Sequence, residues 1–243
     1  MTHSSPLTGT PRGRLPFAPQ GWPFLIPTAL LSLAAFALCW TISAAVLLAL
    51  LLFMLNFFRD PERATPPGDG LFISPADGKV ITAEKTSDGV RVDIFMNVFN
   101  VHVNRAPMSG EIAAMNYTRG RFVNASFPAA SEENERNRFE MTCEDGSKVA
   151  FTQIAGLVAR RIVSYVQPGA KVACGQRIGM IRFGSRVNCE MPAGYSLNVQ
   201  VGDHVTAGLT VLGQRGSGDE TGHGESGHEE SGQNELGEQR AES

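Results

Sequence analysis

The chain has 243 residues, of which 42% are hydrophobic and 19% charged, and its formal net charge is −3 at pH 7. This length and apolar content allow one substantial hydrophobic core with appendages. Residues 214–243 carry −6 and the rest +3, which suits an anionic membrane surface but, without interleaved aromatic and basic residues, excludes nucleic acid as a partner.

The first 23 residues are polar, rich in Pro, Gly, Ser and Thr, and predicted to be a disordered N-terminus. Residues 24–58 contain no charged side chain and are predicted to be a membrane anchor. One straight helix of this length would measure about 52 Å, which exceeds the roughly 30 Å hydrocarbon core of a bilayer. The anchor is therefore either a single span over about residues 36–57 or a helical hairpin turning near residues 40–43.

The charges on either side of the anchor help to orient it. Arg12 and Arg14 precede the apolar segment, and Arg59 and Arg63 follow it. Because positive charge favours the cytoplasmic side, this balance favours a hairpin with both ends on that side.

Residues 59–213 are predicted to form a mainly β (α+β) domain. The segment "VRVDIFM" (90–96) alternates apolar and polar residues, which is typical of a half-buried strand. Asp145-Gly146 separates "RFEMTC" from "KVAFTQI", which predicts a β-hairpin.

An internal repeat marks the C-terminal part of this domain. "VQPGAKVACGQRIG" begins at Val166, and "VQVGDHVTAGLTVLG" begins 33 residues later at Val199. Each unit predicts two short strands around a Gly-x-x-Val turn, as in barrel-sandwich-hybrid domains such as lipoyl and biotinyl carriers. A carrier needs a lysine between the units, but "RFGSRVNCEMPAGYSL" contains none and offers Gly184-Ser185 instead.

Residues 214–243 form a Gly, Glu and Ser tract that is predicted to be a disordered acidic tail. The four cysteines are far apart without a C-x-x-C pair, so their spacing indicates neither a metal site nor disulfides. Reduced, buried thiols in a cytosolic compartment are the simpler interpretation. These cysteines are Cys39, Cys143, Cys174 and Cys189.

Gly-Ser dipeptides occur at 146–147, 184–185 and 216–217, the first in the predicted hairpin and the third in the tail. Gly-Ser is common in turns, so the dipeptide alone favours a turn. A serine hydroxyl can also attack the preceding carbonyl, turning the amide into an ester. Elimination and hydrolysis then leave a pyruvoyl group and ammonia. Glycine at position 184 suits this reaction because it has no Cβ.

Such a cleavage needs a base, and the folded body contains only two histidines. His204 lies in a Gly-Asp-His turn and is predicted to be a solvated turn residue, whereas His102 lies in "NVFNVHVNRAP" and is structural by default. Asp77 in "SPADGKV" reads locally as a turn residue. The remaining histidines lie in the two ends: His3, His223 and His228.

Several motifs taken together resemble the short bacterial and archaeal form of phosphatidylserine decarboxylase, in order over residues 56–213. They are "NFFRDPER" (56–63), "SPADGKV" (74–80), "FMNVFNVHVNRAPMSG" (95–110), "GLVARRIV" (156–163), "GQRIGMIRFGSRV" (175–187) and "VQVGDHVTAG" (199–208).

The resemblance implies self-cleavage between Gly184 and Ser185, giving a β chain of residues 1–184 and an α chain of residues 185–243. Ser185 would become a pyruvoyl group, a covalent cofactor that forms a Schiff base with phosphatidylserine and converts it to phosphatidylethanolamine. The β and α chains would remain together as a heterodimer.

The resemblance also implies site residues. Asp77 matches the family's aspartate, and His102 matches the first position of an H-x-x-H pattern whose second position here is Arg105. A relay of Asp77, His102 and Ser185 is a hypothesis, and His102 is expected to act in cleavage, decarboxylation or both.

The implied substrate places the protein at the cell membrane, with its catalytic domain on the cytoplasmic side and membrane lipids as partners. Arg59 and Arg63 are expected either to bind the lipid phosphate or to anchor the chain at the interface. Two alternatives stay open: a membrane-anchored adaptor or carrier, and a related binding module without self-cleavage.

Overall fold

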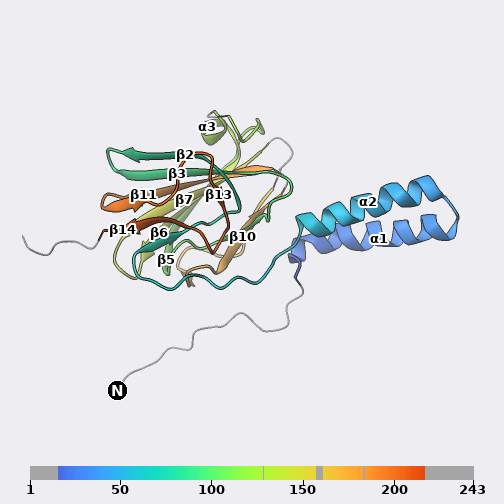
Figure 1. Ribbon diagram of the computed structural model, residues 1–243, viewed down its shortest axis with the longest axis horizontal. Helices are drawn as coiled ribbons and strands as arrows, with labels where there is room; N and C mark the ends of the chain where they lie inside the picture. The colour runs from blue at the N-terminus through green and yellow to red at the C-terminus, as the bar shows by residue number, and fades with distance from the viewer. Residues whose placement is uncertain (1–15, 128, 157–160, 183, 217–243) are drawn as a thin grey trace, which may run out of the picture.

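The computed structural model describes residues 16–127, 129–156, 161–182 and 184–216. They form a β domain from one end of which a pair of helices projects (Figure 1). The expectation of a mainly β fold with an apolar helical segment at its N-terminal side is confirmed.

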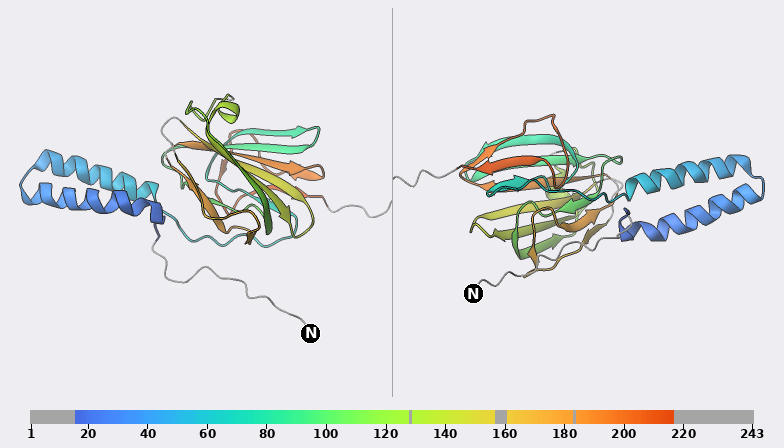
Figure 2. Two further views of the ribbon diagram at one scale, coloured as in Figure 1. Left: turned by 180° about the vertical axis from the view of Figure 1, so that it is seen from behind. Right: turned by 60° about the horizontal axis from the view of Figure 1, so that its bottom comes forward.

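The apolar segment is a helical hairpin and not one continuous helix. The 3₁₀ turn η1 (Pro19–Gly21) leads into α1 (Trp22–Ala37), and α2 (Thr41–Phe57) returns beside it (Figures 1 and 2). Cys39, at φ 55°, reverses the chain and is exposed, unlike the buried thiol expected there. At about 1.5 Å per residue each helix is about 25 Å long, slightly less than a bilayer core. By length and composition, the segment Pro19–Ala37 is apolar enough to cross a membrane, and Thr41–Phe57 is a shorter apolar helix.

Residues on the N-terminal side of the expected boundary at residue 23 already make specific contacts. Ala18 is fully buried and its N–H donates to the Phe58 carbonyl at 2.8 Å, while the Asp60 N–H donates to the Pro16 carbonyl at 2.7 Å. These bonds tie the start of α1 to the end of α2. The hairpin is therefore closed at its base, where it meets the β domain.

The strands form one large curled sheet and two small ones. Within the described ranges the large sheet has the order β13-β2-β3-β11-β7-β6-β5-β9, and the small sheets are β1-β14-β12 and β4-β10-β8. A short helix, α3 (Ala130–Glu133), lies over one end of the domain (Figure 1). The strands are β1 (Leu71–Ile73), β2 (Gly78–Thr86), β3 (Gly89–Met96), β4 (Val103–Arg105), β5 (Gly110–Thr118), β6 (Arg136–Cys143), β7 (Lys148–Ala155), β8 (Ile162–Ser164), β9 (Lys171–Val172), β10 (Arg177–Ile181), β11 (Ser185–Pro192), β12 (Tyr195–Leu197), β13 (His204–Val205) and β14 (Val211–Arg215).

Strand alternation places the core on one face of the large sheet. In β3, residues 90, 92, 94 and 96 are buried in the core, which confirms the strand predicted there. The predicted hairpin at Asp145-Gly146 is also confirmed, because it joins β6 to β7. Phe139 and Phe151 stack across these two strands with ring centroids 4.7 Å apart, and burial of each such side chain contributes about 1.5–3 kcal/mol. Strand β14 ends at Arg215, so it includes the first two residues of the segment expected to be the tail.

The two repeat units fold in the same way. The Gly169 N–H donates to the Ile112 carbonyl at 2.8 Å, and the Gly202 N–H donates to the Val80 carbonyl at 2.9 Å. After each glycine comes a two-residue strand, β9 or β13, a turn, and a five-residue strand, β10 or β14. The prediction of two short strands in each unit is confirmed, but the turn between them follows Val172 or Val205 and is not formed by the Gly-x-x-Val segment, whose valine lies in the first strand.

The equivalence extends far beyond the sequence repeat. Read inward from its two ends, the described part of the large sheet places β13 and β9, β2 and β5, β3 and β6, and β11 and β7 in equivalent positions. The register shift between Val80 and Thr82 of β2 recurs between Ile112 and Ala114 of β5. An approximate two-fold axis therefore passes between β11 and β7.

The same register relates two of the Gly-Ser pairs. Ser185, the first residue of β11, lies opposite Met96, the last residue of β3. Ser147 accepts the N–H of Cys143, the last residue of β6, on its carbonyl oxygen at 2.9 Å. Gly184-Ser185 and Gly146-Ser147 thus stand at equivalent places, the first at the start of β11 and the second directly before β7. The third pair, at 216–217, lies partly outside the described residues.

Candidate active site

Ser185 lies at the centre of the fold, where β11 begins between β3 and β7. It is fully buried, and its hydroxyl donates to the Met96 sulfur at 3.3 Å. Thioether sulfur is a weak acceptor, so this contact leaves the hydroxyl available for reaction. Gly184 has φ 67°, which favours glycine, and a Cβ on Gly156 would clash with the Gly184 carbonyl oxygen. The backbone at the predicted cleavage site therefore has an unusual conformation, and Gly156 lies in close contact with it.

His102 lies directly beside this peptide. Its Nδ1 is 2.9 Å from the Asn100 carbonyl oxygen, and its Nε2 is 3.4 Å from the Gly184 nitrogen. The carbonyl can only accept, so Nδ1 carries the proton and Nε2 presents its lone pair to the Gly184 N–H. The ring packs on Phe57, with centroids 4.2 Å apart. Burial lowers the pKa of His102 to about 4, against smaller raising effects of the Asn100 carbonyl and the Asp77 charge. His102 is therefore a neutral base near pH 7.

Asp77 precedes β2 and is bound by other groups. Its Oδ1 accepts from the Ala207 N–H at 2.8 Å and from Arg63 Nη1 at 2.6 Å, and its Oδ2 accepts from Arg63 Nη2 at 2.9 Å. Among the described residues no hydrogen bond joins Asp77 to His102. In this arrangement Asp77 acts on His102 only through space, and the hypothesised relay is not a continuous hydrogen-bonded chain.

The segment after α2 holds the hairpin to the β domain. Arg59 donates to the Asn56 carbonyl at 2.6 Å and to the Phe99 carbonyl at 2.7 Å, which links the end of α2 to the loop before β4. Arg63 is largely buried and bonds the Ala207 carbonyl at 2.7 Å in addition to Asp77. Both guanidinium groups are thus engaged by the protein itself, in contacts that hold the helical hairpin to the β domain.

The other sequence candidates lie elsewhere. His204 is exposed on β13, as expected of a solvated residue. All four cysteines are free, and in the described part of the chain no group of three His, Cys, Asp or Glu side chains is placed to hold a metal ion.

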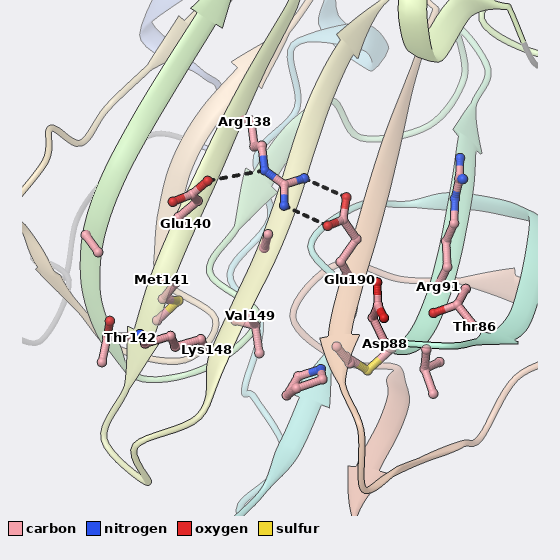
Figure 3. A pocket seen from close by; sticks show the side chains of 15 residues that line it. Thr86, Asp88, Arg91, Arg138, Glu140, Met141, Thr142, Lys148, Val149 and Glu190 are labelled. Carbon is pink, nitrogen blue, oxygen red and sulfur yellow. Dashed lines mark hydrogen bonds and ion pairs between the residues drawn. The ribbon is translucent and has the colours of Figure 1, made fainter.

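A large hollow of about 600 Å³ lies away from Ser185. Arg138 crosses it, with its guanidinium 3.5 Å from Glu140 and 2.6 Å from Glu190 (Figure 3). Glu190 is an odd number of residues from Ser185 on β11, so the two side chains point to opposite faces of the sheet. The hollow in Figure 3 is therefore separate from the site at Ser185.

Comparison with known proteins agrees with this geometry. The sequence model of a family described as phosphatidylserine decarboxylase matches residues 50–213. The chain belongs to the phosphatidylserine decarboxylase family. A protein named phosphatidylserine decarboxylase proenzyme from Desulfotalea psychrophila is 45% identical over 208 residues, covering 83% of this chain and 97% of that protein. One of the same name from Nitratidesulfovibrio vulgaris is 47% identical over 205 residues, covering 81% and 94%.

Within this family chain, Arg105 stands where the resemblance places a second histidine. It donates to the Gly175 carbonyl at 3.0 Å and to the Pro61 carbonyl at 2.8 Å, and it lies 3.6 Å from Asp60. Asp60 also pairs with Arg177 at 2.6 Å. Burial lowers the pKa of Arg105 to about 10, so it keeps its charge near pH 7 and cannot serve as a base. Arg105 instead secures the segment that leads from the helical hairpin into the β domain.

Two polar residues near Ser185 did not emerge from the sequence reasoning. Asn104 Nδ2 donates to the Pro75 carbonyl at 3.3 Å, which fixes its amide so that Oδ1 accepts from Gln153 Nε2 at 2.8 Å. Gln153 Oε1 then has no hydrogen-bond partner among the described residues, although Gln153 is fully buried. Gln153 breaks the apolar alternation of "KVAFTQI" on the core face of β7, and this was the signal available in the sequence.

Proposed function

We propose that this chain is a phosphatidylserine decarboxylase proenzyme that cleaves itself between Gly184 and Ser185 and then converts phosphatidylserine to phosphatidylethanolamine. The observation that carries the proposal is the buried Ser185 hydroxyl beside a left-handed Gly184, with the neutral His102 in contact with the Gly184 N–H. These features suit an intramolecular attack.

In the cleavage step Ser185 Oγ attacks the Gly184 carbonyl carbon, and His102 Nε2 accepts the hydroxyl proton. The peptide C–N bond then breaks and the nitrogen takes up a proton, which leaves an ester between the two residues. Loss of the Ser185 Cα proton expels the Gly184 carboxylate, and water releases ammonia to give the pyruvoyl end. A positioned base contributes about 10²–10⁴-fold to such proton transfers.

The products are a β chain of residues 1–184 and an α chain of residues 185–243, held together because β11 lies between β3 and β7. The pyruvoyl group supplies a ketone that binds the substrate amine covalently and accepts the electron pair released with CO₂. Arg63 holds Asp77, and Asp77 raises the pKa of His102, so these residues tune the base without touching the reacting bond.

The helical hairpin supports a membrane location for this chemistry. The side chains of α1 and α2 that point away from the domain are apolar and exposed, including Ile42 (83%) and Phe36 (75%). Two helices of about 25 Å that return to the same end of the domain fit a hairpin entering the cell membrane from the cytoplasmic side. The catalytic domain would then meet the lipid headgroup at the surface.

The test is conversion of phosphatidylserine by the purified full-length protein in nonionic detergent micelles. We expect phosphatidylethanolamine and CO₂ to form, and borohydride added with the substrate to attach the lipid to residues 185–243 by mass. A cleaved protein that forms neither product nor adduct would contradict the activity, and an uncleaved one would favour a binding module.

A further inference from the structure

Two arginines meet where the hairpin joins the β domain. Arg161 directly precedes β8 and Arg182 directly follows β10, and these strands pair through Ile162 and Ile181. The Arg182 N–H donates to the Arg161 carbonyl at 3.3 Å. The fold therefore brings two side chains that are far apart in the sequence to one edge of the small sheet.

A hollow of about 580 Å³ lies between this edge and the start of α1. It is lined by both arginines and, from the hairpin side, by Pro23 and Phe24. The Arg182 guanidinium lies over the Phe24 ring, 5.8 Å from its centroid. One wall is therefore cationic, and the other is the apolar base of the membrane hairpin.

Arg161 and Arg182 differ from the arginines that support the fold. Arg63, Arg105 and Arg177 each pair with a carboxylate within 4 Å, whereas no ion pair among the described residues includes Arg161 or Arg182. Burial and, to a smaller extent, the neighbouring Arg161 charge lower the pKa of Arg182. Two like charges placed together favour the binding of an anion, which relieves their repulsion.

The hollow is also at the right distance from the reacting bond. Arg182 precedes Ser185 by three residues, a span of at most about 11 Å along the chain. The Ile181 N–H donates to the His102 carbonyl at 3.2 Å, so the end of β10 is tied to the candidate base. In phosphatidylserine only the serine Cβ and one oxygen separate the amine-bearing carbon from the phosphorus. A headgroup that reacts at Ser185 can therefore reach the long arginine side chains with its phosphate.

We propose that Arg161 and Arg182 bind the phosphodiester of the substrate headgroup, while Phe24 and Pro23 contact the glycerol and acyl part of the lipid. This inference rests on the proposed decarboxylase function and names its substrate subsite. A guanidinium pair suits a phosphodiester because each group donates parallel N–H bonds to two oxygens.

The test compares two soluble amines that differ in the phosphate. Glycerophosphoserine carries the phosphodiester, and O-methylserine does not, and neither needs a membrane. Borohydride trapping on residues 185–243, followed by mass spectrometry, gives the concentration of each amine that half-saturates the site. The variants are Arg161→Gln with Arg182→Gln, and the same pair changed to Lys. Arg121→Gln is a control for the loss of a surface charge, because its side chain is 82% exposed.

We expect the double Gln variant to cleave itself normally and to need about 10- to 100-fold more glycerophosphoserine, with O-methylserine unchanged. The Lys variant should recover part of the loss, and Arg121→Gln should match the wild type. Equal loss for both amines, or no loss for glycerophosphoserine, would overturn the proposal.

Bulk anionic lipid offers the same phosphodiester to the two arginines as the substrate does. Sedimentation with phosphatidylglycerol and with phosphatidylcholine vesicles measures binding to that lipid separately. If the double variant loses only binding to phosphatidylglycerol vesicles while glycerophosphoserine trapping is unchanged, the pair binds bulk anionic lipid and the substrate subsite is refuted. If the cleaved wild-type protein traps neither amine, the decarboxylase function itself fails and the subsite fails with it.

Discussion

Two Gly-Ser pairs stand at equivalent places in the duplicated domain, and they differ in their surroundings. Gly184 and Gly146 both have left-handed backbones, with φ 67° and 78°, and both lead into a central strand of the large sheet. However, the Ser147 hydroxyl donates to Asp145 Oδ1 at 2.6 Å, whereas the Ser185 hydroxyl has only the Met96 sulfur. One serine is held by a strong acceptor, and the other is free to react.

The residues around the two pairs also differ, because only the surroundings of Ser185 contain a base and a carboxylate. His102 directly precedes β4, and Gly70 holds the equivalent place before β1. Asp77 precedes β2, and Ser109 holds the equivalent place before β5. Asp77 accepts the Ala207 N–H at 2.8 Å, and Ser109 accepts the Cys174 N–H at 3.0 Å. The comparison teaches that backbone shape alone does not make a cleavage site. The half that carries a base and a carboxylate is the half expected to react.

The largest effect is expected from the two serines themselves. Ser185→Ala removes the attacking oxygen and should leave one uncleaved, inactive chain. Ser147→Ala removes only a turn hydrogen bond, worth about 1 kcal/mol, and should cleave at the wild-type rate. A denaturing gel of both variants checks this, and cleavage of the Ser185→Ala protein would break the comparison.

His102→Gln should slow self-cleavage by about 10²–10⁴-fold, because the amide cannot take the Ser185 proton. The rate is measured by following the uncleaved chain with time after synthesis in a cell-free system. Gly70→Ala, at the equivalent place in the other half, is the control. Because Gly70 has φ 66°, this change lowers stability by backbone strain but should leave the cleavage rate of the folded chain unchanged. Cleavage of His102→Gln at the wild-type rate would remove His102 from this step.

The pH dependence of stability should also reflect His102. Its pKa is about 4 in the folded chain and 6.5 in the unfolded chain, so the unfolded state binds the proton first as the pH falls. The contribution of neutral His102 is fully present above pH 6.5 and is lost towards pH 4, by on the order of 3 kcal/mol. Urea unfolding of uncleaved Ser185→Ala at several pH values, with and without His102→Gln, measures it. An unchanged slope in the His102→Gln protein would show that His102 is not buried as described.

A smaller effect is expected from Asp77→Asn. The change removes a charge that raises the pKa of His102 and leaves the Arg63 guanidinium without its carboxylate, so the base weakens. We expect cleavage to slow, but by less than in His102→Gln, because the base itself remains. Ser109→Ala is the matched variant in the other half and should cleave normally. Equal rates for the two variants would mean that Asp77 has no more influence on cleavage than Ser109.

Local patterns in the sequence were sufficient for the strands and for the place of the cleavage pair. Alternation gave β3, Asp145-Gly146 gave the β6–β7 hairpin, and the repeat placed Gly184-Ser185 between two similar units. The wider two-fold relation was not visible, because β2 and β5 share hydrogen-bond register more than residue identity.

Contacts between distant segments could not be read from local patterns. Arg63 donates to the Ala207 carbonyl, 144 residues away in the sequence. Arg63 also donates to Asp77, so the Asp77 carboxylate is bonded to Arg63 and not to His102. Arg105 likewise gains its structural role only when Asp60 and Gly175 are brought beside it. Such partners are set by tertiary packing and not by spacing along the chain.

The most direct test of the central claim is the intact mass of the purified full-length protein. The account predicts two chains, residues 1–184 and residues 185–243, the second beginning with a pyruvoyl group and therefore blocked to N-terminal sequencing. It predicts no cut between Gly146 and Ser147. A single chain of 26.1 kDa, or cleavage at 146–147, would contradict the claim that the surroundings of Ser185 make it the reactive member of the pair.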